Sequence, residues 1–277
     1  MLNIDLHSHS NFSDGVLAPE LVAARAKKNG VEVWALTDHD TVNGLPLARA
    51  AALELGMHYV PGVEISVTWA TQTIHIVGLQ IDETEPTLVQ GLADTRAGRM
   101  LRARDMATQL AAAGIPDALE GALQYVTNPE SISRTHFARH LVALGICPDI
   151  SSVFRDYLVK GKPGYVPHRW ATLQNAITWI RKAGGIAAVA HPGRYKLDTV
   201  AFDAFLGEFK QLGGSAIEVV TGSHTVDQYQ QYAKIAEHYG FLASRGSDFH
   251  SPNESRVDLG ALPPLPENVT PIWHDWF

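Results

Sequence analysis

Imidazole and carboxylate side chains recur along this chain at spacings that suit the ends of β-strands. Six are histidines and three are acidic residues, namely His7, His9, Asp14, His39, Glu64, His75, His191, Asp248 and His250. Such nitrogens and oxygens are ligands of divalent transition metals. Burying so many of these groups without a cation would carry a large desolvation cost. The set therefore predicts a multinuclear metal centre and favours metal-assisted hydrolysis.

Two pairs of candidates stand two residues apart, in DLHSHS and in GSDFH. Side chains alternate along a strand, so His7 and His9 are expected to project on the same side and to share a metal. The same geometry applies to Asp248 and His250 near the last predicted strand. Asp5 has the parity of the first pair, and we expect it to orient one of the two imidazoles.

Three further candidates come from the second and third predicted strands and the hairpin that follows. In WALTDHD, parity along the strand favours His39 over the aspartates on either side of it. A hairpin turning near Trp69 and Ala70 would place Glu64 and His75 opposite or nearly opposite each other on antiparallel strands. Glu64 could then bridge two ions.

The remaining two candidates lie in turns. Asp14 is in a Ser-Asp-Gly turn, where Gly15 is expected to let the backbone bend the carboxylate toward the cluster. His191 ends an apolar run and is followed by Pro-Gly, which stops the strand and aims the imidazole over the strand ends.

The elements that must position these residues form a repeated pattern of short apolar runs and Ala/Leu-rich stretches of helical period. This predicts an α/β fold of βα units with the chemistry at the carboxyl ends of the strands, as in barrels. The alternation of strand and helix patterns stops from about Arg96 to Gly164, a stretch rich in Ala, Arg and Leu. We therefore expect a barrel from residues 1–95 and 165–277, and a helical insertion at 96–164 covering the site. The proline-rich tail from Leu262 is expected to wrap the surface.

Composition narrows the possible partners and location. A hydrophobic fraction of 45% and a charged fraction of 18% are typical of globular proteins, and no apolar stretch is long enough for a membrane span. The N-terminal segment lacks the pattern of a signal peptide, so we expect a cytoplasmic protein without an evident obligate protein partner. A formal net charge of −7 disfavours an extended nucleic-acid groove but allows a small anionic substrate. Cys147 is expected to be a buried spectator.

The motifs DLHSHSNFSDG, TDHDT, GVEIS, HIVGL, AHPGR and GSDFH together resemble the PHP family, the polymerase and histidinol phosphatase family of metal-dependent phosphoesterases. The resemblance implies a distorted, TIM-like (β/α)7 barrel with two to three metal ions at its mouth. The implied ligand sets are His7, His9, Glu64 and Asp248 for one ion, Glu64, His75 and His191 for a second, and Asp14, His39 and His250 for a third. A nitrogen and oxygen set without thiolate suits Mn²⁺ first, and also Fe²⁺ or Zn²⁺.

Within that family the chain looks most like the TrpH-like branch, through SISRTHFARHLV and GKPGYVPHRW. The resemblance implies a phosphatase that removes the 3′-phosphate of a nucleoside 3′,5′-bisphosphate such as adenosine 3′,5′-bisphosphate. Three alternatives stay open: a 5′-to-3′ exoribonuclease acting on short RNA, a histidinol-phosphate phosphatase, and an amidohydrolase acting on C–N bonds.

A phosphorylated substrate requires cationic groups near the metals. Arg194, close to His191, is our first choice for a phosphate clamp because guanidinium binds phosphate oxygens in a bidentate manner. His224 is a candidate leaving-group acid or substrate contact. Further expected substrate contacts lie in or next to the insertion: Arg134, Thr135, Lys162, Tyr165 and His168.

Overall fold

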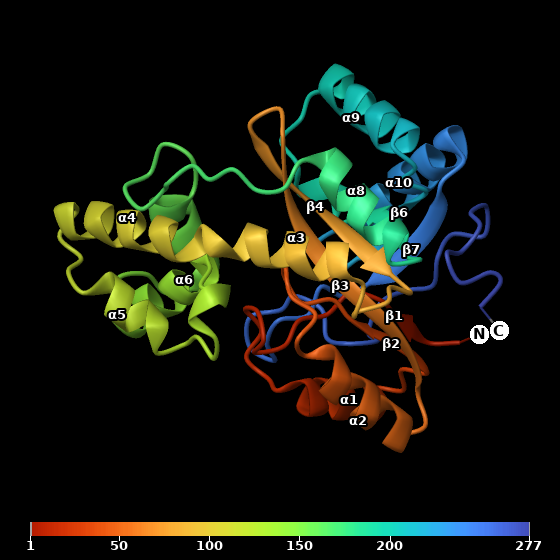
Figure 1. Ribbon diagram of the computed structural model, residues 1–277, viewed down its shortest axis with the longest axis horizontal. Coiled ribbons are helices and arrows are strands. Elements are labelled where there is room, and N and C mark those ends of the chain that lie inside the picture. Colours follow the sequence, from red (N-terminus) through yellow and green to blue (C-terminus); the bar gives the residue numbers. More distant parts are fainter. Residues whose placement is uncertain (1, 277) are drawn as a thin grey trace.

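Seven strands form a nearly closed barrel in the computed structural model, which describes residues 2–276 (Figure 1). The strands follow one another around the sheet in chain order. Their bounds are Ile4–Asp5 (β1), Val33–Leu36 (β2), His58–Trp69 (β3), Gln72–Leu79 (β4), Ile186–Val189 (β5), Ala216–Thr221 (β6) and Leu242–Gly246 (β7).

Strand β4 departs from a regular barrel because it runs against both of its neighbours. Strands β1 to β3 are parallel, as are β5 to β7, but β4 pairs antiparallel with β3 and with β5. The barrel closes where the Leu6 N–H donates to the Arg245 carbonyl at 3.0 Å, and where Ser8 forms a parallel bridge with Phe249. These features confirm the predicted distorted (β/α)7 barrel.

A two-residue turn joins β3 to β4. Both of its residues, Ala70 and Thr71, have positive φ (44° and 68°), as the tight turns of twisted hairpins require. In the resulting register His75 lies opposite Ser66, one diagonal step from Glu64. The hairpin therefore turns where the sequence predicted, with Glu64 and His75 nearly opposite.

Ten α-helices lie among the described residues. Those flanking the barrel are α1 (Pro19–Lys28), α2 (Leu45–Glu54), α3 (Pro86–Ala97), α8 (Leu173–Lys182), α9 (Thr199–Gln211) and α10 (Val226–Tyr239). Those of the insertion are α4 (Arg99–Ala112), α5 (Ala118–Leu123), α6 (Arg134–Ala143) and α7 (Ile150–Val153). Three shorter segments are the 3-10 turns η1 (Pro129–Ser131) and η3 (Pro192–Arg194), and the π turn η2 (Phe154–Leu158).

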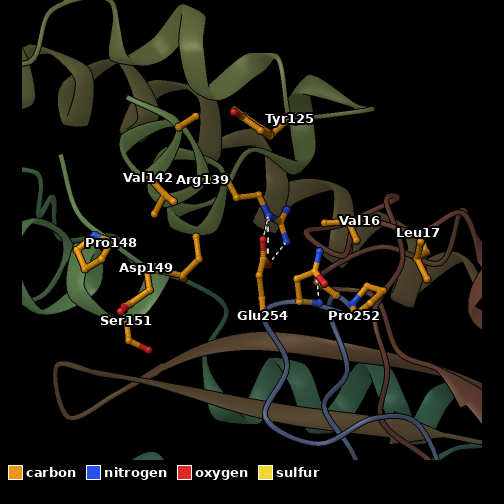
Figure 2. Close-up of a pocket in the computed structure, with 14 residues that line it drawn as sticks. Val16, Leu17, Tyr125, Arg139, Val142, Pro148, Asp149, Ser151, Pro252 and Glu254 are labelled. Carbon is orange, nitrogen blue, oxygen red and sulfur yellow. Dashed lines mark hydrogen bonds and ion pairs between the residues drawn. The ribbon is translucent and has the colours of Figure 1, made fainter. Parts of the chain in front are cut away.

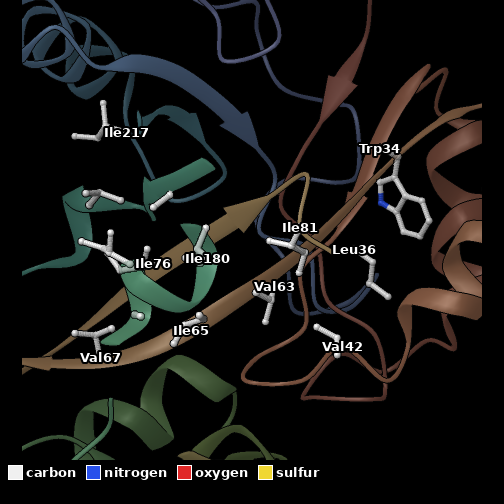
Figure 3. Packing of buried hydrophobic residues seen from close by; sticks show 14 of the residues in the cluster. Trp34, Leu36, Val42, Val63, Ile65, Val67, Ile76, Ile81, Ile180 and Ile217 are labelled. Atoms are coloured by element: carbon white, nitrogen blue, oxygen red, sulfur yellow. The ribbon is translucent and has the colours of Figure 1, made fainter. Parts of the chain in front are cut away.

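The main apolar core fills the space between the sheet and its flanking helices (Figure 3). Alternation along β3 explains how the same strand serves both core and site. Val63 and Ile65 belong to this core and are fully buried, whereas Glu64 between them projects to the other face of the sheet. Strand β2 is buried on both faces, as parallel strands covered by helices are.

Within the segment between β4 and β5, the part that begins at α4 and ends before α8 forms a lobe beside the barrel (Figure 1). It has its own apolar cluster, which extends from Ala103 to Val166 and is separate from the barrel cores. The lobe is reached through α3, whose Gly91 lies so close to Trp179 of α8 that a Cβ there would be 2.3 Å from the indole. The boundaries at residues 96 and 164 stay a prediction.

The C-terminal tail does more than wrap the surface. No helix or strand follows β7 within residues 2–276, but Ile272 is fully buried in an apolar cluster with residues of the barrel interior, such as Val33 and Ala188. Pro271 bridges to Ala243 of β7. Cys147 is free and buried, as predicted. Across the described residues, none of the helices combines the length and the apolar character of a membrane span.

Candidate metal centre and substrate cavity

The structure brings the nine candidate side chains together at one rim of the barrel. Three groups each offer ligand atoms that lie within 4.8 Å of one another: His9, Asp14, His39 and His250; His7, His9, Glu64 and Asp248; and His39, Glu64 and His75. His191 stands beside the third group, with its Nε2 2.9 Å from Glu64 Oε1. Compared with the ligand sets that the family resemblance implies, His39 and His9 each join one more group.

Glu64 lies at the centre of this arrangement. Its Oε1 is 2.9 Å from His75 Nδ1 and 2.9 Å from His191 Nε2, while its Oε2 is 3.1 Å from His7 Nε2. The side chain is fully buried. A carboxylate whose two oxygens face different imidazoles is placed to bridge two cations.

Several buried atoms of the cluster converge without forming hydrogen bonds, and this is the observation that tests whether cations fit. Glu64 Oε2, Asp14 Oδ1 and Asp248 Oδ1 have no hydrogen-bond partner, although imidazole nitrogens lie 3.1 to 3.5 Å away. These atoms point at a shared space and not at each other, which is how the ligands of a metal ion are arranged. The nitrogen and oxygen donors therefore fit divalent transition metals.

The electrostatics of the cluster favour cation binding as well. Burial alone would raise the pKa of Glu64, but the charges of His39 and His7 outweigh it and hold the pKa well below its usual range. Burial lowers the pKa of His39 to about 3 and that of His191 to about 4. Burial would also lower the pKa of His7 and His9, but the carboxylates around them outweigh it, raising the pKa of His7 well above its usual value and that of His9 to about 9. These two imidazoles would therefore release a proton when they bind a cation, whereas His39 and His191 are already neutral.

The first strand ends earlier than the sequence indicated, and this changes the role of one residue. β1 stops at Asp5, so His7 and His9 lie beyond the strand. Asp5 does not orient an imidazole, as we had expected from its parity. Its carboxylate instead accepts the backbone N–H groups of Ser247 and Gly260, both at 2.8 Å, and so joins β1 to the chain after β7.

Glu218 of β6 orients the imidazole in its place, and the sequence analysis missed it. Its Oε1 lies 2.6 Å from His7 Nδ1, and its Oε2 accepts the His191 N–H at 2.6 Å. The second contact holds a strained backbone, since His191 has a φ of 26°. A charged residue inside the apolar strand SAIEVV was the available signal.

Substitution Glu218→Gln should weaken metal binding. The amide cannot accept both donors as a carboxylate does, so His7 and the backbone of His191 lose their fixed orientation. Removing such a supporting group typically lowers metal affinity about 10- to 100-fold. Competition with a chelator of known affinity measures this change. An affinity equal to that of the wild type would contradict the role given to Glu218.

Asp14 reaches the cluster, but the reason that glycine follows it differs from the one expected. Gly15 does not have a positive φ. A Cβ there would lie 2.4 Å from the carbonyl oxygen of His9, so the position requires a residue without a side chain because two backbone segments approach closely.

The aspartates on either side of His39 have other partners. Asp38 accepts hydrogen bonds from the hydroxyl groups of Ser10 and Ser13, both at 2.6 Å. Asp40 accepts from the Ser66 hydroxyl at 2.8 Å and forms an ion pair with Arg99. Of the three residues, His39 alone contributes to the groups of potential ligands.

A cavity of about 180 Å³ opens beside the cluster and is lined by four arginines. Two of them have carboxylate partners: Arg194 Nη2 lies 2.7 Å from Asp248 Oδ2, and Arg99 pairs with Asp40. His39, His75 and His250 also line this cavity and are partly exposed, so a molecule in it would reach the cluster.

The other two arginines, Arg102 and Arg134, have no carboxylate partner among residues 2–276. Arg102 donates only to the Val166 carbonyl (3.0 Å), and Arg134 to the Leu158 carbonyl (3.4 Å). Burial and the charges of Arg134 and Arg99 lower the pKa of Arg102 to about 9. Guanidinium stays charged at neutral pH, so two uncompensated positive charges face this cavity.

The other residues predicted to contact the substrate differ in whether they line this cavity. Thr135 lines the cavity, but its hydroxyl donates to Asp14 at 2.9 Å. His168 packs edge-on against Trp170, with ring centroids 4.2 Å apart, and Tyr165 lies close enough to Arg102 to raise the pKa of its guanidinium slightly against the larger lowering by burial. Lys162 lies on an exposed turn and does not line the cavity. Among these residues, Arg134 has the position best suited to an anion.

His224 has no nitrogen left for proton transfer. Its Nδ1 lies 3.0 Å from the Val219 carbonyl, and its Nε2 accepts the Gly193 N–H at 3.0 Å. Burial lowers its pKa, which fits a neutral ring with one donating and one accepting nitrogen. This geometry argues against the role of leaving-group acid, because that role would require one of these bonds to break.

Comparison with known proteins agrees with this picture. The model of the PHP domain matches residues 5–187. The chain belongs to the PHP family. A relative, the 3′,5′-nucleoside bisphosphate phosphatase of Chromobacterium violaceum, is 49% identical over 99% of this chain and 96% of its own length. The 5′-3′ exoribonuclease Rnm of Escherichia coli is 41% identical over 98% of this chain and 93% of its own.

A solved structure from Chromobacterium violaceum, described as an amidohydrolase with bound sulfate and no metal, has nearly the same fold. Its TM-score is 0.96 at 49% identity, and the match covers 99% of this chain and 95% of the other. The PHP barrel and its helical lobe thus occur together in a solved protein.

Proposed function

We propose that this chain is a metal-dependent phosphoesterase that removes the 3′-phosphate of nucleoside 3′,5′-bisphosphates such as adenosine 3′,5′-bisphosphate. The products are a nucleoside 5′-monophosphate and inorganic phosphate. The 49% identical bisphosphate phosphatase supports this reaction. In the structure, the observation that carries it is the unpaired charge of Arg102 and Arg134 beside the candidate metal centre.

A substrate with two separated phosphates would match both parts of the cavity lining. One phosphate would face the carboxylate and imidazole cluster, which requires cations before it can accept an anion. The second would face Arg102 and Arg134, whose mutual repulsion it would relieve. A monophosphate would leave one of these sites without its partner.

Roles at the centre follow from the three groups of converging atoms. We assign His7, His9, Glu64 and Asp248 to one ion, Glu64, His75 and His191 with His39 to a second, and Asp14, His39 and His250 with His9 to a third. Bound divalent ions would supply an activated water and neutralise charge on the phosphate oxygens. Arg194 lines the cavity from a position next to Asp248, where its free N–H groups could hold the phosphate being released.

Removal and return of the metal tests this proposal directly. Chelated protein should release no phosphate from adenosine 3′,5′-bisphosphate, because the nucleophile and the charge neutralisation both depend on the ions. Mn²⁺ should restore activity best, Fe²⁺ or Zn²⁺ less well, and Mg²⁺ poorly, since imidazole is a weak ligand for magnesium. The measurement is phosphate release after each metal is added back. Failure of every metal would reject this substrate.

A 5′-to-3′ exoribonuclease acting on short RNA is the second candidate. A second cavity of about 340 Å³ borders Asp248 and His250 and contains Arg194 and Arg256, which offers room for a further nucleotide. The 41% identical exoribonuclease also supports it. Parallel assays on adenosine 3′,5′-bisphosphate and on a 5′-phosphorylated trinucleotide separate the two, because the higher kcat/KM identifies the preferred substrate.

Two further assays, on histidinol phosphate and on an amide, test the remaining alternatives. A histidinol-phosphate phosphatase would release phosphate from histidinol phosphate at a higher rate than from the bisphosphate. An amidohydrolase would release ammonia or a carboxylate from an amide and no phosphate. Cytoplasmic location stays a prediction from the sequence.

A further inference from the structure

The two oxygens of Asp14 have different surroundings. Oδ2 accepts the Thr135 hydroxyl at 2.9 Å and lies 3.4 Å from the hydroxyl of Ser133, the N-cap of α6. Oδ1 has no hydrogen bond and lies 3.3 Å from His250 Nε2 and 3.8 Å from His39 Nε2. The helical insertion therefore holds one oxygen of this carboxylate and leaves the other facing the imidazoles.

Arg139 of α6 connects the same turn to a second loop of the barrel. Its Nη2 donates to the Asp14 carbonyl at 2.7 Å, and its Nε and Nη2 contact the Glu254 carboxylate at 2.9 and 2.8 Å (Figure 2). The next residue, Ser255, accepts the His250 N–H at 2.8 Å. One buried guanidinium thus joins the two loops that carry Asp14 and His250.

These polar contacts stand beside a cavity, not within a packed interface. A space of about 740 Å³ lies between Val142 and Ile150 of the insertion and Val16 and Pro252 of the barrel loops, and Arg139 lines it (Figure 2). Apolar packing between the insertion and the barrel is therefore interrupted at this cavity. Thr135 and Arg139, with Ser133 at a longer distance, connect this end of α6 to the turn that carries Asp14.

The other two groups of potential ligands do not share this dependence. Their common member, Glu64, lies on β3, and the imidazole of His7 is oriented by Glu218 of β6. Both supports belong to the barrel. Among the nine candidate ligands, the side chain of Asp14 is the one that accepts hydrogen bonds from the insertion in the described structure.

We infer that α6 completes one of the three metal sites. Thr135 and Arg139 are positioning residues that fix Asp14 so that His9, Asp14, His39 and His250 bind a divalent cation when the insertion is docked on the barrel. The sites built around Glu64 form independently of that docking. This inference rests on the proposed function, because it takes the three groups as metal sites.

The test compares Mn²⁺ binding to the full chain and to its variants by equilibrium dialysis, with metal content measured by elemental analysis. Thr135→Val removes the hydroxyl but keeps the shape of the side chain, and it should weaken one of three ions by at least about 10-fold. Thr135→Ser should restore wild-type binding, because it returns the hydroxyl. Arg139→Ala should weaken the same ion further, with the other two unchanged.

Two controls separate this effect from general damage to the insertion. Thr108→Val removes an exposed hydroxyl that donates to the Arg104 carbonyl, and Arg155→Ala removes an exposed ion pair with Asp156. Both should bind three ions as the wild type does. Unchanged binding in Thr135→Val, or equal weakening of all ions, would overturn the inference alone. A wild-type chain that takes up no Mn²⁺ would overturn the proposed function with it.

Discussion

Glu64→Gln should abolish catalysis, with kcat/KM for adenosine 3′,5′-bisphosphate falling at least ~10³-fold, or about 4 kcal/mol of transition-state stabilisation. Glu64 lies within 3.2 Å of five imidazoles and belongs to two of the three groups of potential ligands. The amide removes a negative charge and one strong ligand from both groups. Phosphate release and bound Mn²⁺, measured on the same sample, should fall together.

Glu83→Gln is the matched control for this variant. It makes the same chemical change at a glutamate that pairs with Arg49, away from the cluster. We expect it to retain wild-type activity and metal content. If Glu64→Gln kept its full metal content and activity, the bridging position given to this carboxylate would be refuted.

Arg134→Ala and Arg102→Ala should each change which phosphate ester the enzyme prefers. Hydrogen bonds to charged groups contribute about 1.5 to 3 kcal/mol, so kcat/KM for the 3′,5′-bisphosphate should fall about 10- to 100-fold. Adenosine 3′-monophosphate lacks the second phosphate and gains nothing from these arginines. Its kcat/KM should stay unchanged, so the ratio of the two values reports the loss.

Arg104→Ala serves as the control, because Arg104 is exposed on the same helix as Arg102. It should leave both substrates unaffected. An equal fall for the bisphosphate and the monophosphate would contradict the assignment of a second-phosphate site, since it would mean that the arginines support the cluster and not the substrate.

The candidate ligands could be found from the sequence because their positions follow from local rules. Alternation selected His39 over its neighbours, and although β2 ends at Leu36, His39 still forms an isolated parallel bridge with Glu64. The two-residue turn after β3 determined that Glu64 and His75 meet. These rules act over a few residues. The structure places all nine candidates in one cluster, and their binding of metal stays a prediction.

The contacts that the sequence did not predict all join distant segments. Glu218 reaches His7 across 211 positions, and Thr135 reaches Asp14 across 121. The sequence did not indicate the position of Arg102 for a different reason. In an Ala- and Arg-rich helical stretch it resembles a residue of a solvated face, and its place beside the cavity depends on the first turn of α4, where Arg99 pairs with Asp40 of the barrel.

The reversal of β4 allows the segment that forms the lobe to vary without a change in the barrel strands. Because β4 runs antiparallel to its neighbours, the chain leaves it at the end of the barrel opposite the rim that carries the candidate ligands, returns along α3, and enters the lobe beside the barrel (Figure 1). It returns through Ala171, which forms a parallel bridge with Val67 of β3 in the same hairpin. A lineage could therefore exchange the intervening segment to acquire new specificity while its strands stay untouched. Any transplanted segment would still have to provide a hydroxyl for Asp14.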